Sequence, residues 1–366
     1  MNIDIILPYK EHFTASNASA VSISVKNSLV YSNYKKDIKI FGQNVNYPMF
    51  SENFVGLNIN RYIHFSKNIS LIKSYLRKSN FNNEQKLIEI HNRPYLINYL
   101  YPNIKNNPLV LYFHNDPLQM QGSKKISERK EILNKVSGLV FVSEYLKERF
   151  LEGINKEYSK LHVIPNSLSI NQNANLNKKK QVLFVGRIVR EKGVEVYVEA
   201  IKNIAHKFPD WKFYLVGETR SRNKFFGKSF EKNIINNFLK IGPNVERIGY
   251  IPNDDVIKLM EQSSILVVPS LWQEPFGLTA MEGLSNKMAV IANKVGGLAD
   301  IVKENGILIE NINVENLTNK LNELITNPNL ILKIQERSWL NYKYDQKTIS
   351  SKQDLIRQEL YDNFKC

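Results

Sequence analysis

The 366 residues are enough for two domains of ordinary size, and a 43% apolar content can supply their cores. No apolar run approaches the roughly 18 residues that span a bilayer, and Met1–Leu7 resembles a first strand rather than a signal peptide. The single cysteine, Cys366, excludes a disulfide within the chain and fits a reducing, cytoplasmic compartment. The net charge of +15 favours anionic partners: nucleic acid, phosphorylated ligands or an anionic membrane surface.

Short runs of Val, Ile and Leu alternate with helical patterns through the first half of the chain. Several runs are continuous rather than alternating, which is typical of parallel strands that are covered on both faces. This order predicts a doubly wound α/β architecture. We expect strands at Ile3–Leu7, Lys39–Phe41, Leu87–Ile90, Leu109–Phe113, Gly138–Val142 and His162–Ile164.

Residues 53–83 carry five basic side chains and no acidic one: Arg61, Lys67, Lys73, Arg77 and Lys78. In the same segment Ile69, Ile72, Tyr75 and Leu76 repeat at helical spacing. A basic amphipathic helix of this kind can lie on an anionic membrane. An ordinary surface helix in a lysine-rich protein has the same pattern, so both interpretations stay open.

A polar segment without strong periodicity, Asn166–Gln181, separates two arrays of strands and helices of similar size. Its composition is that of a linker. We therefore expect a first Rossmann-like domain at 1–170, a second at 171–345, and a terminal helix at 346–366 that crosses back to the first domain.

The second half repeats the strand and helix alternation. Expected strands are Val182–Val185, Lys212–Val216, Val245–Ile248, Ile265–Val268, Ala289–Ala292 and Gly306–Ile309, and expected helices include Val194–His206, Asp254–Gln262, Val314–Thr326 and Asp345–Phe364.

Two cations follow the first of these strands. Gly186 and Arg187 end the strand, and Lys192 precedes the Val194 helix. In a doubly wound sheet, ligands bind beyond the carboxyl ends of the strands, so a diphosphate suits this place. The alternative is a surface Arg and Lys that flank a turn.

Two glutamates, Glu274 and Glu282, stand eight positions apart after the Ile265–Val268 strand. On one continuous helix they would point about 80° apart and lie about 12 Å apart along the axis. The turn Pro275-Phe276-Gly277 interrupts such a helix and lets both carboxylates face one ligand. The alternatives are a first-turn acid favoured by the helix dipole and a solvated helix residue.

This pair resembles the Glu-x7-Glu signature of retaining, nucleotide-sugar-dependent glycosyltransferases of family 4. The resemblance covers most of the chain and is densest at 182–300. It implies the GT-B fold, in which two doubly wound Rossmann-like domains face a central cleft. It also implies that Glu282 accepts hydrogen bonds from the ribose, that Glu274 contacts the donor sugar, and that Arg187 and Lys192 bind the diphosphate. The implied donor contacts further include Gly186, Gly217, Tyr250, Phe276, Gly277, Leu278 and Thr279.

Pieces of the first half are similar to glycosyltransferases that assemble the lipopolysaccharide core. They are Ile90–Pro94, Gln119–Lys124 and Phe141–Glu144. The resemblance implies that His114 touches the donor sugar. It places His91, Asn92, Asn115, Asp116 and Ser19 on the acceptor or donor-sugar side. One departure is the loop Thr14–Ala20, which lacks the Gly-Gly pair of many relatives.

The motifs that the sequence lacks narrow the possible classes of reaction. The sequence has no Asp-x-Asp motif, no clustered metal ligands and no Gly-x-x-x-x-Gly-Lys-Ser/Thr loop. We therefore expect no metal and no cofactor, and a nucleotide sugar as co-substrate. The expected partners are this donor, a glycan or lipid-linked acceptor, and the membrane through 53–83. A storage-polysaccharide synthase, a basic nucleic-acid-binding protein and a catalytically silent scaffold remain as alternatives.

Overall fold

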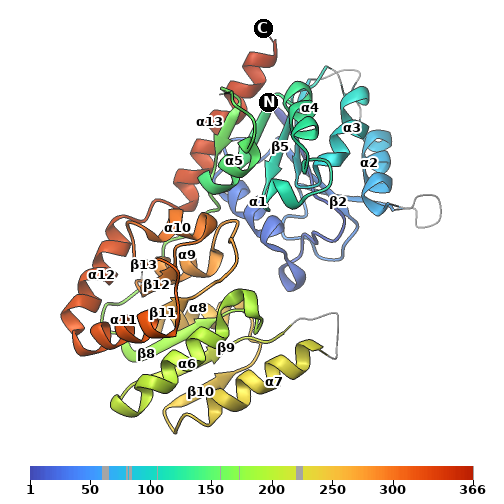
Figure 1. Cartoon of the computed structure of the whole chain (residues 1–366). Coiled ribbons are helices and arrows are strands. Elements are labelled where there is room, and N and C mark those ends of the chain that lie inside the picture. Colours follow the sequence, from blue (N-terminus) through green and yellow to red (C-terminus); the bar gives the residue numbers. More distant parts are fainter. Residues whose placement is uncertain are drawn as a thin grey trace. The chain divides into compact units, whose positions relative to one another are not determined.

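The computed structural model describes residues 1–366 except 60–65, 80, 82–84, 105, 157, 173, 220–225 and 366. The chain divides into two compact units (Figure 1). Unit 1 comprises Met1–Ser167 and Tyr344–Cys366, and unit 2 comprises Leu168–Lys343. Arg61 and Cys366 lie outside the described residues.

Unit 1 is built on a parallel sheet whose strand order is β3-β2-β1-β4-β5-β6-β7. The order reverses between β1 and β4, which makes that place the topological switch point. The strands are β1 Asn2–Ile6, β2 Ile38–Gln43, β3 Phe54–Leu57, β4 Lys86–His91, β5 Leu109–Phe113, β6 Gly138–Phe141 and β7 Leu161–Val163. The helices are α1 Ala20–Val30, α2 Lys67–Lys78, α3 Ile97–Leu100, α4 Ile126–Lys135, α5 Glu144–Leu151 and α13 Gln346–Lys365.

The continuous apolar runs form the inner strands of this sheet. All five residues of β5 are buried, and so are four of the five in β1, which confirms the interpretation of such runs as parallel strands covered on both faces. The sequence analysis missed β3. This strand is short, lies at the edge of the sheet and has one buried residue, so its pattern is weak.

Helix α2 uses its apolar face inside unit 1. Leu71, Ile72 and Tyr75 are buried, and the Tyr75 hydroxyl donates a hydrogen bond of 2.9 Å to Asp4. The basic side chains Lys67, Lys73, Arg77 and Lys78 are exposed. The arrangement therefore matches the ordinary surface-helix interpretation of the apolar pattern. Among the described residues, none of the helices combines the length and apolar character that a membrane-spanning segment needs.

Helix α13 belongs to unit 1 and packs beside α1 (Figure 1). The Ser350 hydroxyl donates to the carbonyl of Ser28 at 2.9 Å, and the Ser32 hydroxyl donates to Asp354 at 2.8 Å. These bonds fix the last helix against a segment more than 300 positions earlier in the sequence.

Unit 2 contains a second parallel sheet, with the order β10-β9-β8-β11-β12-β13. Its switch point lies between β8 and β11. The strands are β8 Lys179–Val185, β9 Lys212–Val216, β10 Val245–Ile248, β11 Ser263–Val268, β12 Ala289–Asn293 and β13 Ile307–Ile309. The helices are α6 Val194–Ile204, α7 Phe226–Leu239, α8 Asn253–Gln262, α9 Leu278–Ser285, α10 Gly296–Val302, α11 Val314–Thr326 and α12 Pro328–Leu340.

The expected linker is only partly a linker. Its last residues, Lys179–Gln181, are the start of β8, where Gln181 pairs with Lys212. Asn171 donates hydrogen bonds to Glu261 at 2.6 Å and to Asn286 at 2.9 Å. The boundary between the units, at Ser167 and Leu168, falls inside the expected linker, and these hydrogen bonds hold the part after it on unit 2.

Candidate functional site

The switch point of unit 2 gathers most of the predicted donor-site residues. Gly186 and Arg187 follow β8, Gly217 follows β9, and the segment from Ser270 to Gly277 follows β11. Because all these strands are parallel, their carboxyl ends meet at one edge of the sheet.

Lys192 and Glu274 form an ion pair across this switch point. The same Glu274 oxygen, Oε1, accepts a hydrogen bond of 2.6 Å from the Ser270 hydroxyl. Glu274 is buried, with 6% exposure, whereas the Lys192 side chain is 24% exposed and lies over the Trp272 ring at 5.5 Å. A cation and a carboxylate that are 82 positions apart in sequence are thus held together at one point.

Glycines shape the backbone around Glu274. Gly193 and Gly296 have φ of 67° and 49°, and a Cβ on either would overlap a carbonyl oxygen, that of Pro269 or of Glu274. The amide of Gly297 donates to the Glu274 carbonyl at 2.7 Å. The pair Gly296-Gly297 therefore serves close packing and turn geometry at this edge.

Gly277 separates the two glutamates. Its φ of 123° precedes α9, so Glu274 lies in the loop while Glu282 lies on the helix, as the sequence predicts. Glu282 is half-buried and accepts a hydrogen bond of 3.4 Å from Asn253. Burial raises the pKa of Glu282 to about 7.

The other predicted donor contacts differ in exposure. Arg187 is exposed, and no hydrogen bond or ion pair joins its side chain to another described residue. Tyr250 is 55% exposed after β10, whereas Phe276 is buried. Leu278 and Thr279 open α9, and Gly217, at φ 120°, has no room for a Cβ against the Gly186 carbonyl.

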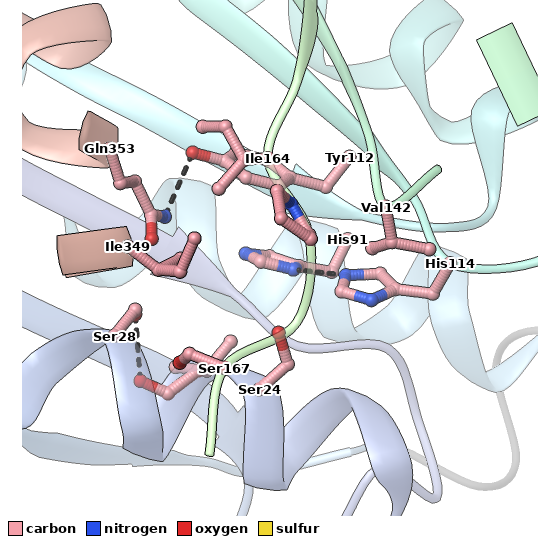
Figure 2. A pocket seen from close by; sticks show the side chains of 12 residues that line it. Ser24, Ser28, His91, Tyr112, His114, Val142, Ile164, Ser167, Ile349 and Gln353 are labelled. Atoms are coloured by element: carbon pink, nitrogen blue, oxygen red, sulfur yellow. Dashed lines mark hydrogen bonds between the residues drawn. The ribbon is translucent and has the colours of Figure 1, made fainter. Parts of the chain in front are cut away.

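The predicted first-half residues cluster at the carboxyl edge of the unit 1 sheet. His91 ends β4 and His114 follows β5. Figure 2 shows the two imidazoles side by side, joined between His91 Nδ1 and His114 Nε2 at 2.9 Å. The rings stack, with centroids 5.1 Å apart, and His91 also stacks on Tyr112 at 4.5 Å. They line a pocket of about 10 Å³ together with Ser24, Ser28 and Gln353.

Burial separates the roles of these residues. Asn92 is fully buried, His91 is 2% exposed and His114 is 9% exposed, so His114 is the least enclosed of the three. The Asn92 side-chain oxygen accepts from the His114 amide at 2.9 Å and so ties β4 to β5. Burial and then the charge of Arg357 lower the pKa of His91 to about 3, and burial and then His91 lower the pKa of His114 well below its usual value.

The remaining candidates of unit 1 take part in local structure. Asp116 caps the turn Pro117–Gln119 by accepting from the Leu118 amide, and it pairs with Arg149 at 3.2 Å. Ser19 caps α1 by accepting from the Ser22 amide. Asn115 is exposed.

Sequence reasoning missed a buried ionic network beneath the histidines. Arg357 of α13 donates to both oxygens of Glu89 in β4, at 2.7 and 2.8 Å, and to Asp354 at 3.2 Å. The Tyr112 hydroxyl donates to Glu89 at 2.9 Å and accepts from Gln353 at 3.0 Å. The available signal was Glu89 itself, an acid inside an otherwise apolar strand, because such a charge needs a partner.

An open pocket of about 310 Å³ adjoins this edge and was also missed. Arg93, Tyr95, Gln119, Met120 and Gln121 line it. Arg93 is half-buried with φ 57°, and no hydrogen bond or ion pair joins its side chain to another described residue. The signal in the sequence was the position of Arg93, two residues after the end of β4.

Among the described residues, no group of three or more His, Cys, Asp or Glu side chains could hold a metal ion.

The fold of the whole chain is the GT-B fold, with two parallel-stranded α/β units. A sucrose-phosphate synthase from Thermosynechococcus elongatus matches it with a TM-score of 0.76 at 18% identity, covering 99% of this chain and 100% of that one. The Anabaena protein HepE in complex with UDP-glucose matches with a TM-score of 0.72 at 16% identity, covering 99% and 100%.

Sequence comparison agrees for unit 2. Residues 167–340 match the family model described as glycosyl transferases group 1. An uncharacterized glycosyltransferase of Methanocaldococcus jannaschii is 35% identical over 52% of this chain and 50% of its own length. The lipopolysaccharide 1,2-N-acetylglucosaminetransferase of Salmonella typhimurium is 22% identical over 66% of this chain and 64% of its own. The family match thus covers unit 2, and the structural matches show the fold of the whole chain.

Proposed function

We propose that the chain is a retaining glycosyltransferase of family 4 that moves a sugar from a nucleotide diphosphate donor to a glycan or glycolipid acceptor. The observation that carries the proposal is the Lys192–Glu274 ion pair at the unit 2 switch point, with exposed Arg187 beside it in sequence. Sugar transfer requires a cation that can bind the phosphate and a carboxylate that can face the anomeric carbon. Lys192 and Glu274 can supply this pair once a phosphate replaces Glu274 as the partner of Lys192.

The proposed reaction proceeds on one face of the sugar. The bond between the anomeric carbon and the diphosphate oxygen breaks, and its electron pair leaves with the diphosphate. The acceptor hydroxyl oxygen forms the new bond on the same face, and its proton passes to the departing phosphate oxygen. Lys192 and Arg187 oppose the negative charge that grows on the phosphate, while Glu274 opposes the positive charge on the anomeric carbon.

Glu282 is proposed to accept hydrogen bonds from the ribose hydroxyls. Its half-buried place on α9 and its raised pKa suit a group that receives neutral donors. His114 of unit 1 is proposed to contact the donor sugar.

The test of the donor site is a hydrolysis and transfer screen over UDP-, GDP- and ADP-sugars. With the preferred donor, Arg187→Ala and Lys192→Ala should each lower kcat about 100-fold, the usual effect of removing a group that stabilises transition-state charge. Lys202→Ala is the matched control, since Lys202 is exposed on α6 and pairs only locally with Glu199. Near-normal turnover in both site variants would contradict the proposal.

Metal independence is a separate part of the proposal. It rests on the cations Arg187 and Lys192, which can neutralise the diphosphate without a divalent ion. Turnover in EDTA should equal turnover in Mg²⁺ or Mn²⁺. A loss of activity in EDTA that Mg²⁺ restores would refute this part and leave the donor assignment standing.

For the acceptor we propose a lipid-linked saccharide of the cell envelope. The support is the Salmonella relative, whose name states transfer within lipopolysaccharide. Transfer to a detergent-solubilised glycolipid is expected, and transfer to glycogen-like chains instead would indicate a storage-polysaccharide synthase.

Peripheral membrane contact is proposed to be electrostatic. Its support is the exposed side chains Lys67, Lys73, Arg77 and Lys78 of α2. Co-sedimentation with anionic vesicles but not with neutral ones is the expected result, and reversing all four charges should abolish it. Equal binding to both kinds of vesicle would contradict an electrostatic contact.

A further inference from the structure

His91 and His114 form a closed pair of rings at the edge of the unit 1 sheet. The bond of 2.9 Å between His91 Nδ1 and His114 Nε2 uses one nitrogen of each ring. In Figure 2 the second nitrogen of each ring points away from the other ring. Stacking on Tyr112 from one side holds His91 in this orientation.

Both rings are neutral near pH 7. Burial and the charge of Arg357 lower the pKa of His91, and burial lowers that of His114. A neutral imidazole has one N–H donor and one bare acceptor nitrogen. The contact therefore contains one proton, and its position decides which nitrogen of His114 remains bare.

The carboxylate of Glu89 favours one position of that proton. Glu89 Oε2 lies 4.0 Å from His91 Nε2, and this buried Nε2 has no hydrogen-bond partner among the described residues. A bare Nε2 would turn its lone pair toward a carboxylate, whereas an N–H there turns its positive end toward it. Arg357 donates to both oxygens of Glu89 and so holds the carboxylate in place.

The position of each ring proton in the pair follows from this. His91 carries its hydrogen on Nε2, so its Nδ1 is bare and accepts from the Nε2–H of His114. His114 is left with a bare Nδ1.

We propose that His91 is a positioning residue that fixes His114 in the Nε2–H tautomer, so that His114 offers the donor sugar a hydrogen-bond acceptor and not a donor. The proposal deepens the proposed function, because it rests on His114 as the residue that contacts the donor sugar. His91 acts only through His114, since its own ring is 2% exposed, against 9% for His114.

The proposal has a consequence for donor specificity. A bare Nδ1 needs a hydroxyl that donates. Fluorine keeps a weak acceptor but cannot donate, so the donor analogue that carries fluorine at the contacted position should lose about tenfold in kcat/KM, the value of one hydrogen bond. If His114 donated instead, the fluoro sugar would keep part of the contact and the loss would be small.

The direct test is the tautomer itself. The full chain, labelled with ¹⁵N only in its six histidines, is observed in long-range ¹H–¹⁵N spectra, with His114→Gln assigning the signal. The expected result is a protonated Nε2 and a bare Nδ1 in His114. A protonated Nδ1 in His114 would overturn the proposal. This reading needs no turnover, so it stays distinct from a failure of the proposed function, which would appear as no transfer from any nucleotide sugar.

Two variants of His91 supply the second test. His91→Asn can keep an acceptor oxygen near the place of Nδ1, whereas His91→Leu cannot. We expect His91→Asn to keep the His114 tautomer and most of the turnover. We expect His91→Leu to mix the two tautomers and lower kcat about tenfold, with less change in the KM of the donor. Equal turnover in the two variants, or an unmixed His114 tautomer in His91→Leu, would overturn the proposal.

Discussion

The two sheet edges differ in how their functional residues are held. In unit 2 the candidate site is charged and partly open: Lys192 meets Glu274 near exposed Arg187, and their elements follow adjacent strands. In unit 1 the site is a stack of neutral, buried rings resting on an ion pair between Glu89 and Arg357. The first edge is suited to bind and release an anion, and the second to hold one imidazole in a fixed state.

The same difference governs the cost of removing a charge. The side chains of Glu89 and Arg357 are 0% and 1% exposed, whereas that of Lys192 is 24% exposed. A cation removed from unit 1 leaves a carboxylate with no access to water. A cation removed from unit 2 leaves Glu274 with the Ser270 hydroxyl and nearby solvent.

Replacing Arg357 should therefore produce the largest loss of stability. Arg357→Met leaves the Glu89 carboxylate buried without its cation, and we expect unit 1 to lose about 3–5 kcal/mol of unfolding free energy. Lys192→Met should cost unit 2 less, about 1–2 kcal/mol. Urea unfolding is followed by far-UV circular dichroism for the whole chain and by tryptophan fluorescence for unit 2 alone, because all three tryptophans (Trp211, Trp272 and Trp339) lie there.

The control for this prediction is the double variant Glu89→Gln with Arg357→Met, which removes both charges and should recover most of the lost stability. An Arg357→Met chain that unfolds like the wild type would mean that the ion pair contributes little, and the stated contrast between the units would fail.

The pH dependence of the two units should have opposite signs. Below pH 6.5 the unfolded chain binds protons at His91 and His114 that the folded chain does not, so unit 1 loses stability as the pH falls. The His91 pKa of about 3 corresponds to a loss of about 2 kcal/mol between pH 6.5 and 5. Glu282 behaves the other way. Its folded pKa of about 7 exceeds the usual 4.5, so the folded chain binds the extra proton and unit 2 gains about 2 kcal/mol between pH 7 and 5.

Variants isolate each contribution to this pH dependence. Tryptophan fluorescence at pH 5 and 7 should show the gain in unit 2 for the wild type and a smaller one for Glu282→Gln. His91→Asn should reduce the acid sensitivity of the circular dichroism transition of unit 1. If Glu282→Gln leaves the slope of unit 2 unchanged, its carboxyl titrates normally and the burial argument is wrong.

The sequence predicted best those features that depend on neighbouring residues alone. Continuous apolar runs such as Leu109–Phe113 became inner strands because parallel strands bury both faces. Gly277 broke the helix between Glu274 and Glu282 because its φ of 123° disfavours other residues. Both arguments need only neighbouring residues, so a single sequence suffices for them.

The sequence could not predict what distant segments build together. Arg357 reaches Glu89 across 268 positions, and nothing near either residue indicates the other. His91 and Asn92 were expected on the acceptor or donor-sugar side, and the burial of both side chains could not be predicted. The direction of a side chain at such an end depends on the backbone that follows, and Asn92 and Arg93 both adopt φ of 57°, which residue identity alone does not predict.

The smallest predicted effect concerns Arg93 of unit 1, which combines a left-handed backbone with a charged side chain at an open pocket. A left-handed backbone costs a residue other than glycine about 1–2 kcal/mol, and glycine gives back about 0.5–1 kcal/mol through its freedom in the unfolded chain. Arg93→Gly should therefore stabilise unit 1 by about 0.5 kcal/mol.

The same substitution removes the guanidinium of Arg93 from the 310 Å³ pocket. If that pocket holds part of the acceptor, Arg93→Gly should raise the acceptor KM about fivefold and leave donor hydrolysis unchanged. Arg93→Ala is the matched variant, since it removes the same charge but keeps the strain. If only Arg93→Gly raises the stability, the gain comes from relief of backbone strain. If both variants raise the acceptor KM, the lost charge is the cause of the weaker binding. An unchanged acceptor KM in both variants would assign Arg93 no part in recognition.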